Sequence, residues 1–445
     1  MTIEGLSSIQ TTSLEILSED LASPKILWWR ENLNFFILAF LILFLIRFYC
    51  VEFFLIPSQS MYPTLYGHPH SGDRILVNRA AYDFSQFSSH QIRRWEVIVF
   101  KFPLNLSRNF VKRVVALPGE TVEIRSSNIW IQKQIATKPP EIQDHLFFEN
   151  GRNPALSFLE FFHQNFQLTP HQKPFRSIAK EGVIQVSSLD RATALYVPQN
   201  SYAYDKDTKI HLRFLPLHIV GSLQITLTVG NAQAVLIVRE TQIELHVLQD
   251  EKLSFSQKIP FNLLLNQTHF LEFAFVDSQI NARLDEQELF PVYRVDPSAL
   301  EIETRFFQLD FFQMECKLQN IRVFYDIRYT RDIDHLPYAQ VQSKEYFVCG
   351  DNSVESDDSR NWRKIFLSVQ RFGQTFFYEG QAEQSEKMWK ENGVVFVDTL
   401  GKQYHFFPGT VKVVEKKPFP GVPKSYILGK AWLIIWPPDR MQWIR

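Results

Sequence analysis

The strongest apolar pattern lies near the N-terminus, where residues 33–46 are almost wholly apolar. Continued to about Val51, this segment predicts a helix of roughly the length that crosses the hydrocarbon core of a bilayer. Aromatic residues before the segment and Tyr49 after it suit the two headgroup layers. A buried core helix is the alternative, because the purely apolar stretch is short for a span. The apolar residues 53–56 extend the membrane-affine surface and favour the span.

The rest of the chain alternates apolar and polar residues over short runs, which predicts strands. Between Val183 and Tyr329 the runs recur at the spacing of an antiparallel sandwich. A helix is predicted near Gln381–Trp389. The runs that predict strands are 74–78, 96–102, 110–117, 223–229, 234–238, 243–248, 269–276, 321–329, 393–397, 404–407 and 429–437. We therefore expect a mainly β protein in which one β unit is inserted into another.

Composition excludes several classes. The formal net charge of −1 gives no argument for nucleic-acid binding, and a 45% hydrophobic content with 40 Phe is ample for sizeable cores. Three cysteines are too few for a disulfide framework, so we expect free thiols, although pairing of Cys316 with Cys349 stays open. The polar N-terminus lacks the basic start of a cleavable signal peptide.

A candidate nucleophile, Ser60, follows the apolar segment within a few residues. A serine hydroxyl needs a base to take its proton. None of the 12 His stands in a recognisable nucleophile–base motif. His68 and His70 fit a polar loop better than a metal site, so no metal and no cofactor are expected.

Lysine replaces histidine as a base only when it is neutral, which requires its pKa to fall by several units through burial. Strand alternation places Lys112 on the same face as Phe110 and Val114, while Arg113 points the other way. This is the desolvated position that a general-base lysine needs, but the strand pattern alone favours the alternative reading. An edge-strand lysine with its amine in water is the alternative.

Two further features accompany this pair. Ser58 lies two residues before Ser60, so a tight turn would direct its hydroxyl and the Ser60 N–H at one oxyanion. Residues 349–360 gather hydroxyls, carboxylates and an arginine. Taken alone, such a segment is a solvated acidic loop or a calcium loop, but its Asp spacing does not fit an EF-hand.

Together these segments resemble the bacterial type I signal peptidases (leader peptidases), which are membrane-bound peptidases with a Ser/Lys dyad. The segments that carry the resemblance are Ser58–Leu65, Lys112–Arg113 with Ala116–Glu120, Gly350–Arg360, and Gly429–Ala431 with Trp436–Pro437. They occur in the family's order behind the expected anchor.

The resemblance implies roles for individual residues. Ser60 would be the nucleophile and Lys112 the general base. Ser58 and the Ser60 N–H would form the oxyanion hole, and Ser356 would orient the lysine amine. The remaining implied roles are a structural ion pair of Asp358 with Arg360, support of the polar loop by Asp351, and a place in the substrate groove for Met61.

The resemblance also implies an organisation and a location. We expect a polar segment (1–32), a transmembrane anchor (33–51), a catalytic domain in two parts (52–182 and 330–445), and an inserted β-sandwich (183–329). A further insertion covers about 363–421. The implied location is the inner (plasma) membrane, single-pass, with the catalytic domain on the extracytoplasmic side. The implied partners are exported preproteins, cut after small residues of an Ala-X-Ala type, and membrane lipid.

The chain departs from the family pattern in its long inserts and at Ser353, where many relatives carry arginine. Region 183–329 resembles laminin-G or legume-lectin sandwiches, which leaves a glycan ligand, a protein ligand or a bracing role open. Two alternative functions also stay open. One is a non-catalytic envelope-binding protein on the same scaffold, and the other is a Ser/Lys protease of other membrane proteins.

Overall fold

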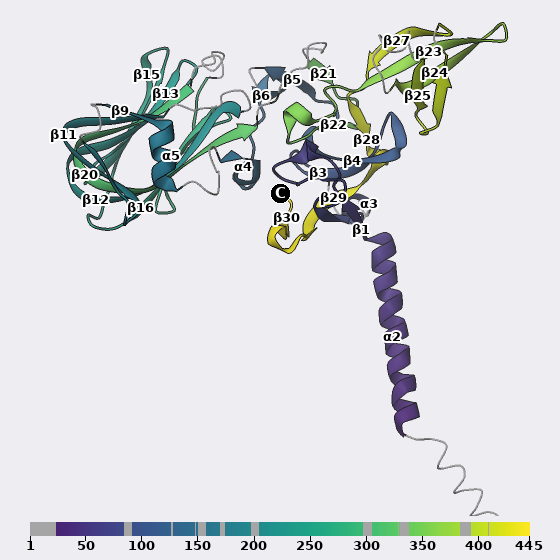
Figure 1. Ribbon diagram of the computed structural model, residues 1–445, viewed down its shortest axis with the longest axis horizontal. Helices are drawn as coiled ribbons and strands as arrows, with labels where there is room; N and C mark the ends of the chain where they lie inside the picture. The colour runs from purple at the N-terminus through teal and green to yellow at the C-terminus, as the bar shows by residue number, and fades with distance from the viewer. Residues whose placement is uncertain are drawn as a thin grey trace, which may run out of the picture.

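The computed structural model describes residues 24–83, 91–125, 128–146, 148–149, 157–169, 174–196, 204–296, 305–327, 329, 338–382, 393–407 and 409–445. Within these residues the chain is mainly β, as predicted, with few helices. One long helix extends away from the folded body, and the β-sheets lie beyond its C-terminal end (Figure 1). The predicted polar segment falls largely outside the described residues.

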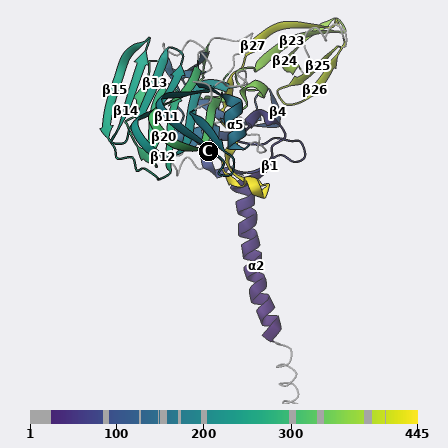
Figure 2. The ribbon, with the colours of Figure 1, turned by 60° about the vertical axis from the view of Figure 1, so that its left-hand side comes forward.

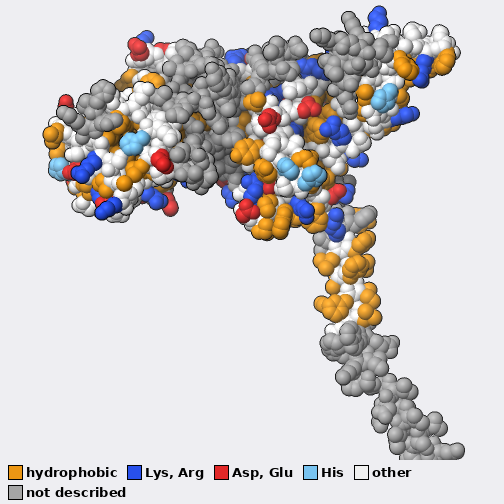
Figure 3. Space-filling model, viewed as in Figure 1, with side chains coloured by type: hydrophobic (Ala, Val, Ile, Leu, Met, Phe, Trp, Pro, Cys, Tyr) orange, Lys and Arg blue, Asp and Glu red, His pale blue; other side chains and the backbone are white. Residues whose placement is uncertain are grey.

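The long helix, α2 (Pro24–Tyr49), has 26 residues. Large apolar side chains along it are exposed, among them Phe35 at 66% and Phe40 at 71%. Figure 3 shows these apolar side chains around the described part of the helix. Among the described residues, no helix is both long enough and apolar enough to cross a membrane.

An eight-stranded antiparallel sheet follows directly, with strand order β1-β2-β29-β3-β4-β22-β28 and β30 paired to β29. Alternation places Ile75 and Val77 of β2 in the core and leaves Leu76 between them only partly covered. The strands are β1 (Val51–Leu55), β2 (Arg74–Asn78), β3 (Val97–Phe102), β4 (Asn105–Ala116), β22 (Glu345–Cys349), β28 (Gly421–Pro423), β29 (Ile427–Trp436) and β30 (Gln442–Trp443). Strands from both ends of the chain thus build one sheet, as the ordered motifs predict.

A small sheet with order β21-β5-β6-β7 packs beside it. Its strands are β5 (Thr121–Arg125), β6 (Asn128–Ile131), β7 (Gln134–Ile135) and β21 (Tyr338–Gln340). Its apolar residues share a core with Val115 and Phe347 of the eight-stranded sheet.

The inserted part is a thirteen-stranded antiparallel sheet around its own large core. Figure 2 shows its strands lying side by side in a curved arrangement. Its strands are β8 (Phe148–Glu149), β9 (Phe166–Thr169), β10 (Phe175–Ile178), β11 (Val183–Tyr196), β12 (Tyr204–Val229), β13 (Ala232–Val238), β14 (Gln242–Gln249), β15 (Lys252–Pro260), β16 (His269–Val276), β17 (Gln279–Leu284), β18 (Gln287–Glu288), β19 (Tyr293–Arg294) and β20 (Arg305–Ile327). Three of these strands precede residue 183, because β8 pairs with β20 and β9 and β10 pair with β11.

The second insertion forms a five-stranded sheet with order β26-β25-β24-β23-β27. Its strands are β23 (Arg363–Arg371), β24 (Gln374–Ala382), β25 (Val394–Asp398), β26 (Gln403–Phe406) and β27 (Val411–Pro418). The helix predicted near Gln381–Trp389 is wrong at its start, because Gln381 and Ala382 pair with β25. The rest of that segment lies outside the described residues.

Short helices complete the fold. α5 begins at a capping box in which Ser157 and Glu160 satisfy each other's backbone N–H groups. The short helices are α3 (Ala80–Asp83), α4 (Pro140–Leu146), α5 (Phe158–Asn165), η1 (Gln59–Met61), η3 (Ser353–Glu355), η4 (Lys424–Tyr426) and η5 (Pro438–Arg440). All three cysteines are free thiols.

Candidate active site

Ser60 lies in η1, the short helical turn between β1 and β2. Gln59 donates from its side-chain amide to the Gly67 carbonyl at 2.6 Å, which closes the loop. A Cβ on Gly67 would lie 1.7 Å from the Ser58 carbonyl oxygen. The close backbone approach that shapes this loop therefore requires glycine.

Lys112 reaches this loop from β4. Its Nζ lies 2.5 Å from the Ser60 Oγ, and the lysine is 3% exposed. The Phe110 ring lies on the same side, with its centroid 5.7 Å from Nζ. The predicted desolvated position of Lys112 is what the structure has, because interior packing rather than water surrounds the amine.

The pKa of Lys112 is lowered from its usual value. Burial is the largest cause, because it penalises the ammonium form. The negative charges of Asp358, Asp357 and Asp351 act in the opposite direction, and Arg360 adds to the lowering. A fraction of neutral amine is thus available nearer to neutral pH than for a lysine in water.

The other two predicted hydroxyls lie close by. Ser58 Oγ is 3.5 Å from Ser60 Oγ. Ser356 is 4% exposed, and its Oγ makes no hydrogen bond within the described part of the chain. A Cβ on Gly350 would lie 2.1 Å from that Oγ and 2.4 Å from the Ser60 carbonyl oxygen. Gly350 therefore lets Ser356 approach the turn that contains Ser60, although Ser356 makes no hydrogen bond to Lys112 in the structure.

Asp358 and Arg360 form the predicted ion pair. Arg360 Nε and Nη2 each lie 2.8 Å from one oxygen of Asp358. The same carboxylate accepts from the Gly350 N–H at 2.9 Å, and Arg360 donates to Ser353 Oγ at 2.6 Å. Ser353, the departure from the family pattern, is thus a partner of the arginine.

Asp351 has a partner that the sequence did not reveal. Arg113 donates to both of its oxygens, from Nε at 2.7 Å and from Nη2 at 2.8 Å, and neither side chain is exposed. Thr64 donates to Asp351 at 2.6 Å. One sequence feature could have indicated this pair: Arg113 lies on the strand face opposite Lys112, inside an apolar run, where a buried arginine needs an acidic partner.

Met61 is 1% exposed and packs in a core cluster with Ile56 and Val97. Its place in a substrate groove stays a prediction. His68 Nδ1 accepts from the N–H groups of His70 and Ser71, which is the geometry of a polar loop.

One group of buried acidic residues lies apart from Ser60 and Lys112. Within the described residues, Asp207, Asp277 and Asp326 are the only His/Cys/Asp/Glu trio close enough to hold a metal. Lys138 Nζ contacts Asp277 at 2.8 Å and also contacts Asp326. An ammonium already supplies the cation here, so this group is an ion-pair junction between the small sheet and the inserted sheet.

Comparison with known proteins identifies relatives of the segment that contains Ser60 and Lys112. Residues 29–203 match the family described as "Signal peptidase, peptidase S26". The probable signal peptidase I-1 of Synechocystis sp. is 33% identical over 124 residues, which are 25% of this chain and 59% of the relative. Signal peptidase I of Aquifex aeolicus is 39% identical over 178 residues, which are 39% of this chain and 60% of the relative. The chain thus spans less than two thirds of the length of these relatives.

These matches confirm the resemblance to type I signal peptidases. Among solved structures, a carbohydrate-binding module, CBM66 from Bacillus subtilis, is 12% identical with a TM-score of 0.26. That match covers 33% of this chain and 88% of the module. A likeness this weak carries no argument.

Proposed function

We propose that this chain, a relative of the type I signal peptidases, is a membrane-bound serine endopeptidase that removes signal peptides from exported preproteins. One observation carries the proposal: the Lys112 amine lies 2.5 Å from the Ser60 hydroxyl and is almost fully buried. A serine with a neutral amine at hydrogen-bond distance is the minimum arrangement for acyl transfer without histidine.

The reaction follows from this geometry. Neutral Lys112 takes the proton of Ser60 as Oγ bonds to the scissile carbonyl carbon, and the carbonyl oxygen becomes an oxyanion. The Ser60 N–H and the Ser58 hydroxyl donate to that oxyanion. The protonated lysine then gives its proton to the leaving amine as the C–N bond breaks. Water then attacks the acyl carbon and passes a proton to Lys112, which returns it to the Ser60 Oγ as the ester C–O bond breaks and the new carboxyl group leaves.

Supporting roles belong to the polar loop. Asp358, Arg360 and Asp351 hold the loop through buried ion pairs, and Ser356 orients the lysine amine when substrate is bound. The groove that contains Met61 takes the substrate. Cleavage after small residues, of an Ala-X-Ala type, is the specificity that the family resemblance implies.

Helix α2 anchors the enzyme in the plasma membrane in this proposal. Its exposed apolar side chains suit lipid contact. The catalytic body then lies at the extracytoplasmic surface, where signal peptides emerge.

The test is cleavage of a preprotein with an Ala-X-Ala site by the detergent-solubilised full chain. Wild type should cut after the final Ala, and Ser60→Ala and Lys112→Ala should both abolish the cut. Lys112→Arg should also be inactive, because a guanidinium does not deprotonate. Lys101→Ala is the matched control, since Lys101 is an exposed lysine of the neighbouring strand.

Cleavage that persists in Ser60→Ala would contradict the proposal. Failure of folded wild-type protein to cleave would instead support the non-catalytic binding protein. A serine protease that rejects preproteins but cuts other membrane proteins through Ser60 would support the third alternative.

A further inference from the structure

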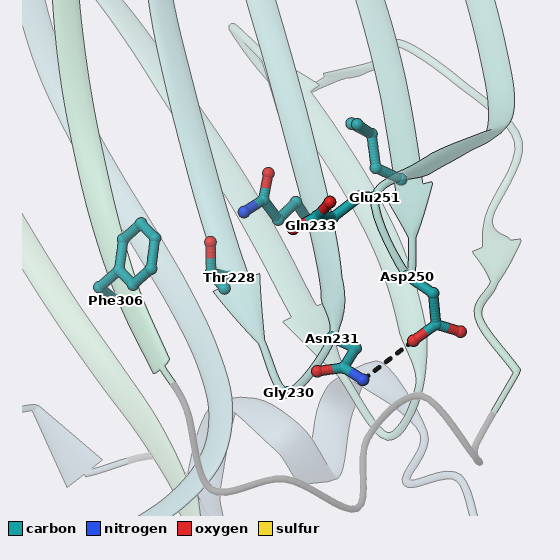
Figure 4. Close-up of a pocket in the computed structure, with 8 residues that line it drawn as sticks. Thr228, Gly230, Asn231, Gln233, Asp250, Glu251 and Phe306 are labelled. Carbon is teal, nitrogen blue, oxygen red and sulfur yellow. Dashed lines mark hydrogen bonds between the residues drawn. The ribbon is translucent and has the colours of Figure 1, made fainter.

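The inserted sheet carries a pocket of about 480 Å³ that has no part in the proposed peptidase chemistry. It lies where β12 turns into β13 and β14 turns into β15, beside the start of β20 (Figure 4). Most residues lining it are polar, and a single aromatic residue, Phe306, stands at one side. The pocket therefore suits a hydroxylated ligand better than an apolar one.

Strand register builds the floor of the pocket. Thr228 of β12 lies opposite Phe306 on one neighbouring strand and opposite Gln233 on the other. Gln233 in turn lies opposite Leu248 of β14. Residues directly opposite one another share a face of a sheet, so these four side chains form one row. Their neighbours along each strand, such as Leu227, face the core on the other side.

Two tight turns add the polar end of the pocket. Gly230 takes a positive φ of 59°, and Asp250 and Glu251 take 49° and 62°. Left-handed backbone at two consecutive non-glycine residues is uncommon and costs energy. The turn directs Asp250 toward Asn231, whose Nδ2 donates to Asp250 Oδ1 at 2.9 Å (Figure 4). The other side-chain oxygens, Asn231 Oδ1 and Asp250 Oδ2, make no hydrogen bond within the described residues.

Thr228 supplies an independent sign of a ligand. It lines the pocket and is 5% exposed, yet its Oγ1 has no hydrogen-bond partner in the described chain. Buried polar groups in proteins are nearly always paired, and an unpaired one destabilises the fold. Valine would fill the same space without that cost. Because this oxygen has almost no accessible surface, a ligand would complete its hydrogen bonds once the Thr228 side chain rotates toward the pocket.

We propose that this pocket binds an uncharged saccharide unit of a glycan. Side-chain amides, carboxylates and a hydroxyl supply both donors and acceptors, and sugar hydroxyls need both. The Phe306 ring provides a flat apolar surface for the C–H face of a pyranose ring. Asp250 and Glu251 disfavour anionic ligands, and the described residues that line the pocket include no Lys or Arg to hold a phosphate or a uronate.

The test measures glycan binding by the full chain in detergent, using isothermal titration calorimetry. The probes are maltohexaose, cellohexaose, laminarihexaose and hexa-N-acetylchitohexaose, each to 5 mM, with hexagalacturonate as the anionic comparison. We expect at least one neutral oligosaccharide to bind and the uronate not to bind. Neutral probes that all fail to bind, or preferential binding of the uronate, would overturn the proposal.

Variants assign the binding to this pocket. Thr228→Val should weaken it by about tenfold through one lost hydrogen bond, while leaving the thermal unfolding of the protein unchanged or improved. Thr226→Val is the matched control, because Thr226 lies on the same face two residues away, outside the pocket lining, and accepts from Gln224. Phe306→Ala should also weaken binding, whereas Phe377→Ala, at an exposed aromatic of the five-stranded sheet, should not.

An equal loss of glycan affinity in Thr226→Val and Thr228→Val would contradict the assignment of binding to this pocket. Unchanged affinity in both Thr228→Val and Phe306→Ala would contradict it as well. The measurement is independent of the peptidase proposal, since Ser60→Ala protein should bind the same glycan as wild type.

Discussion

The Arg113 guanidinium and the Asp351 carboxylate meet in a two-point ion pair, and neither side chain reaches solvent. This pair joins β4, which carries Lys112, to the loop that carries Ser356 and Asp358. Arg113 also donates to the Trp95 carbonyl at 2.6 Å and to the Arg445 carbonyl at 2.9 Å. One side chain thus fixes the distance between the two halves of the proposed catalytic centre.

Arg113→Met should therefore destabilise the eight-stranded sheet by about 3–5 kcal/mol, because it leaves Asp351 buried without its counter-charge. Hydrogen exchange of the β4 and β22 amides measures this local opening. Arg125→Met is the control: Arg125 pairs with Glu123 at the surface, where such a pair contributes about 0–1 kcal/mol. Equal effects of the two substitutions would contradict the role assigned to Arg113.

Asp357→Asn should move the pH dependence of cleavage to lower pH. In the proposed mechanism the neutral amine is the base, so the rate should rise with pH through the pKa of Lys112. Burial lowers that pKa most, and the negative charge of Asp357 raises it. Removing this charge lowers the pKa further, so more neutral lysine is present at each pH on the rising limb. Asp357→Glu keeps the charge and should leave the limb in place, and a shift of the Asn variant to higher pH would refute the lysine base.

Lys112→Met should stabilise the protein at neutral pH. The folded-state pKa of Lys112 lies below its unfolded value, so between the two the unfolded chain binds more protons and stability rises with pH. Below that range the buried amine must carry a charge at a cost. Methionine removes the cost, and its advantage should fade as the pH approaches about 10.4, the value for a free lysine. Thermal unfolding of the variant and the wild type at several pH values measures the difference in stability. A stabilisation by methionine that grows with pH would contradict the prediction.

Gly350→Ala should abolish cleavage and destabilise the site. The added Cβ would lie 2.1 Å from Ser356 Oγ and 2.4 Å from the Ser60 carbonyl oxygen. The backbone at Ser60 cannot shift without moving the Ser60 hydroxyl, the proposed nucleophile, away from Lys112. Gly373→Ala is the comparison, because it has open space around its Cβ, although its positive φ adds local strain at an exposed turn. Gly373→Ala should still cleave the Ala-X-Ala preprotein, whereas Gly350→Ala should not.

Short-range pattern was enough to predict several features of this protein. Alternation along residues 110–117 placed Lys112 and Arg113 on opposite faces, and the structure has them so. The predicted strand 74–78 coincides with β2, and 269–276 coincides with β16. Such predictions succeed because period-two alternation is a property of adjacent residues.

Other features escaped the sequence because their causes lie far apart along the chain. Arg113 and Asp351 are 238 residues apart, and Asp73 meets Arg440 across 367 residues. The strands β8 to β10 were missed because they are short and gain their place only by pairing with β11 and β20. Gln381 and Ala382 were predicted to be helical but form a strand for the same reason, because pairing with β25 outweighs local propensity.

The sequence by itself determined the mainly β class, the candidate nucleophile and base, and the opposite orientation of Lys112 and Arg113. These follow from residue chemistry and local periodicity. Only the tertiary structure decided that the Lys112 amine meets the Ser60 hydroxyl, that Arg113 pairs with Asp351, and that Thr228 is buried beside a polar pocket. Each of these depends on which distant strands pair and on how much water they exclude, and burial is what sets the charge state of a lysine and the cost of an unpaired hydroxyl.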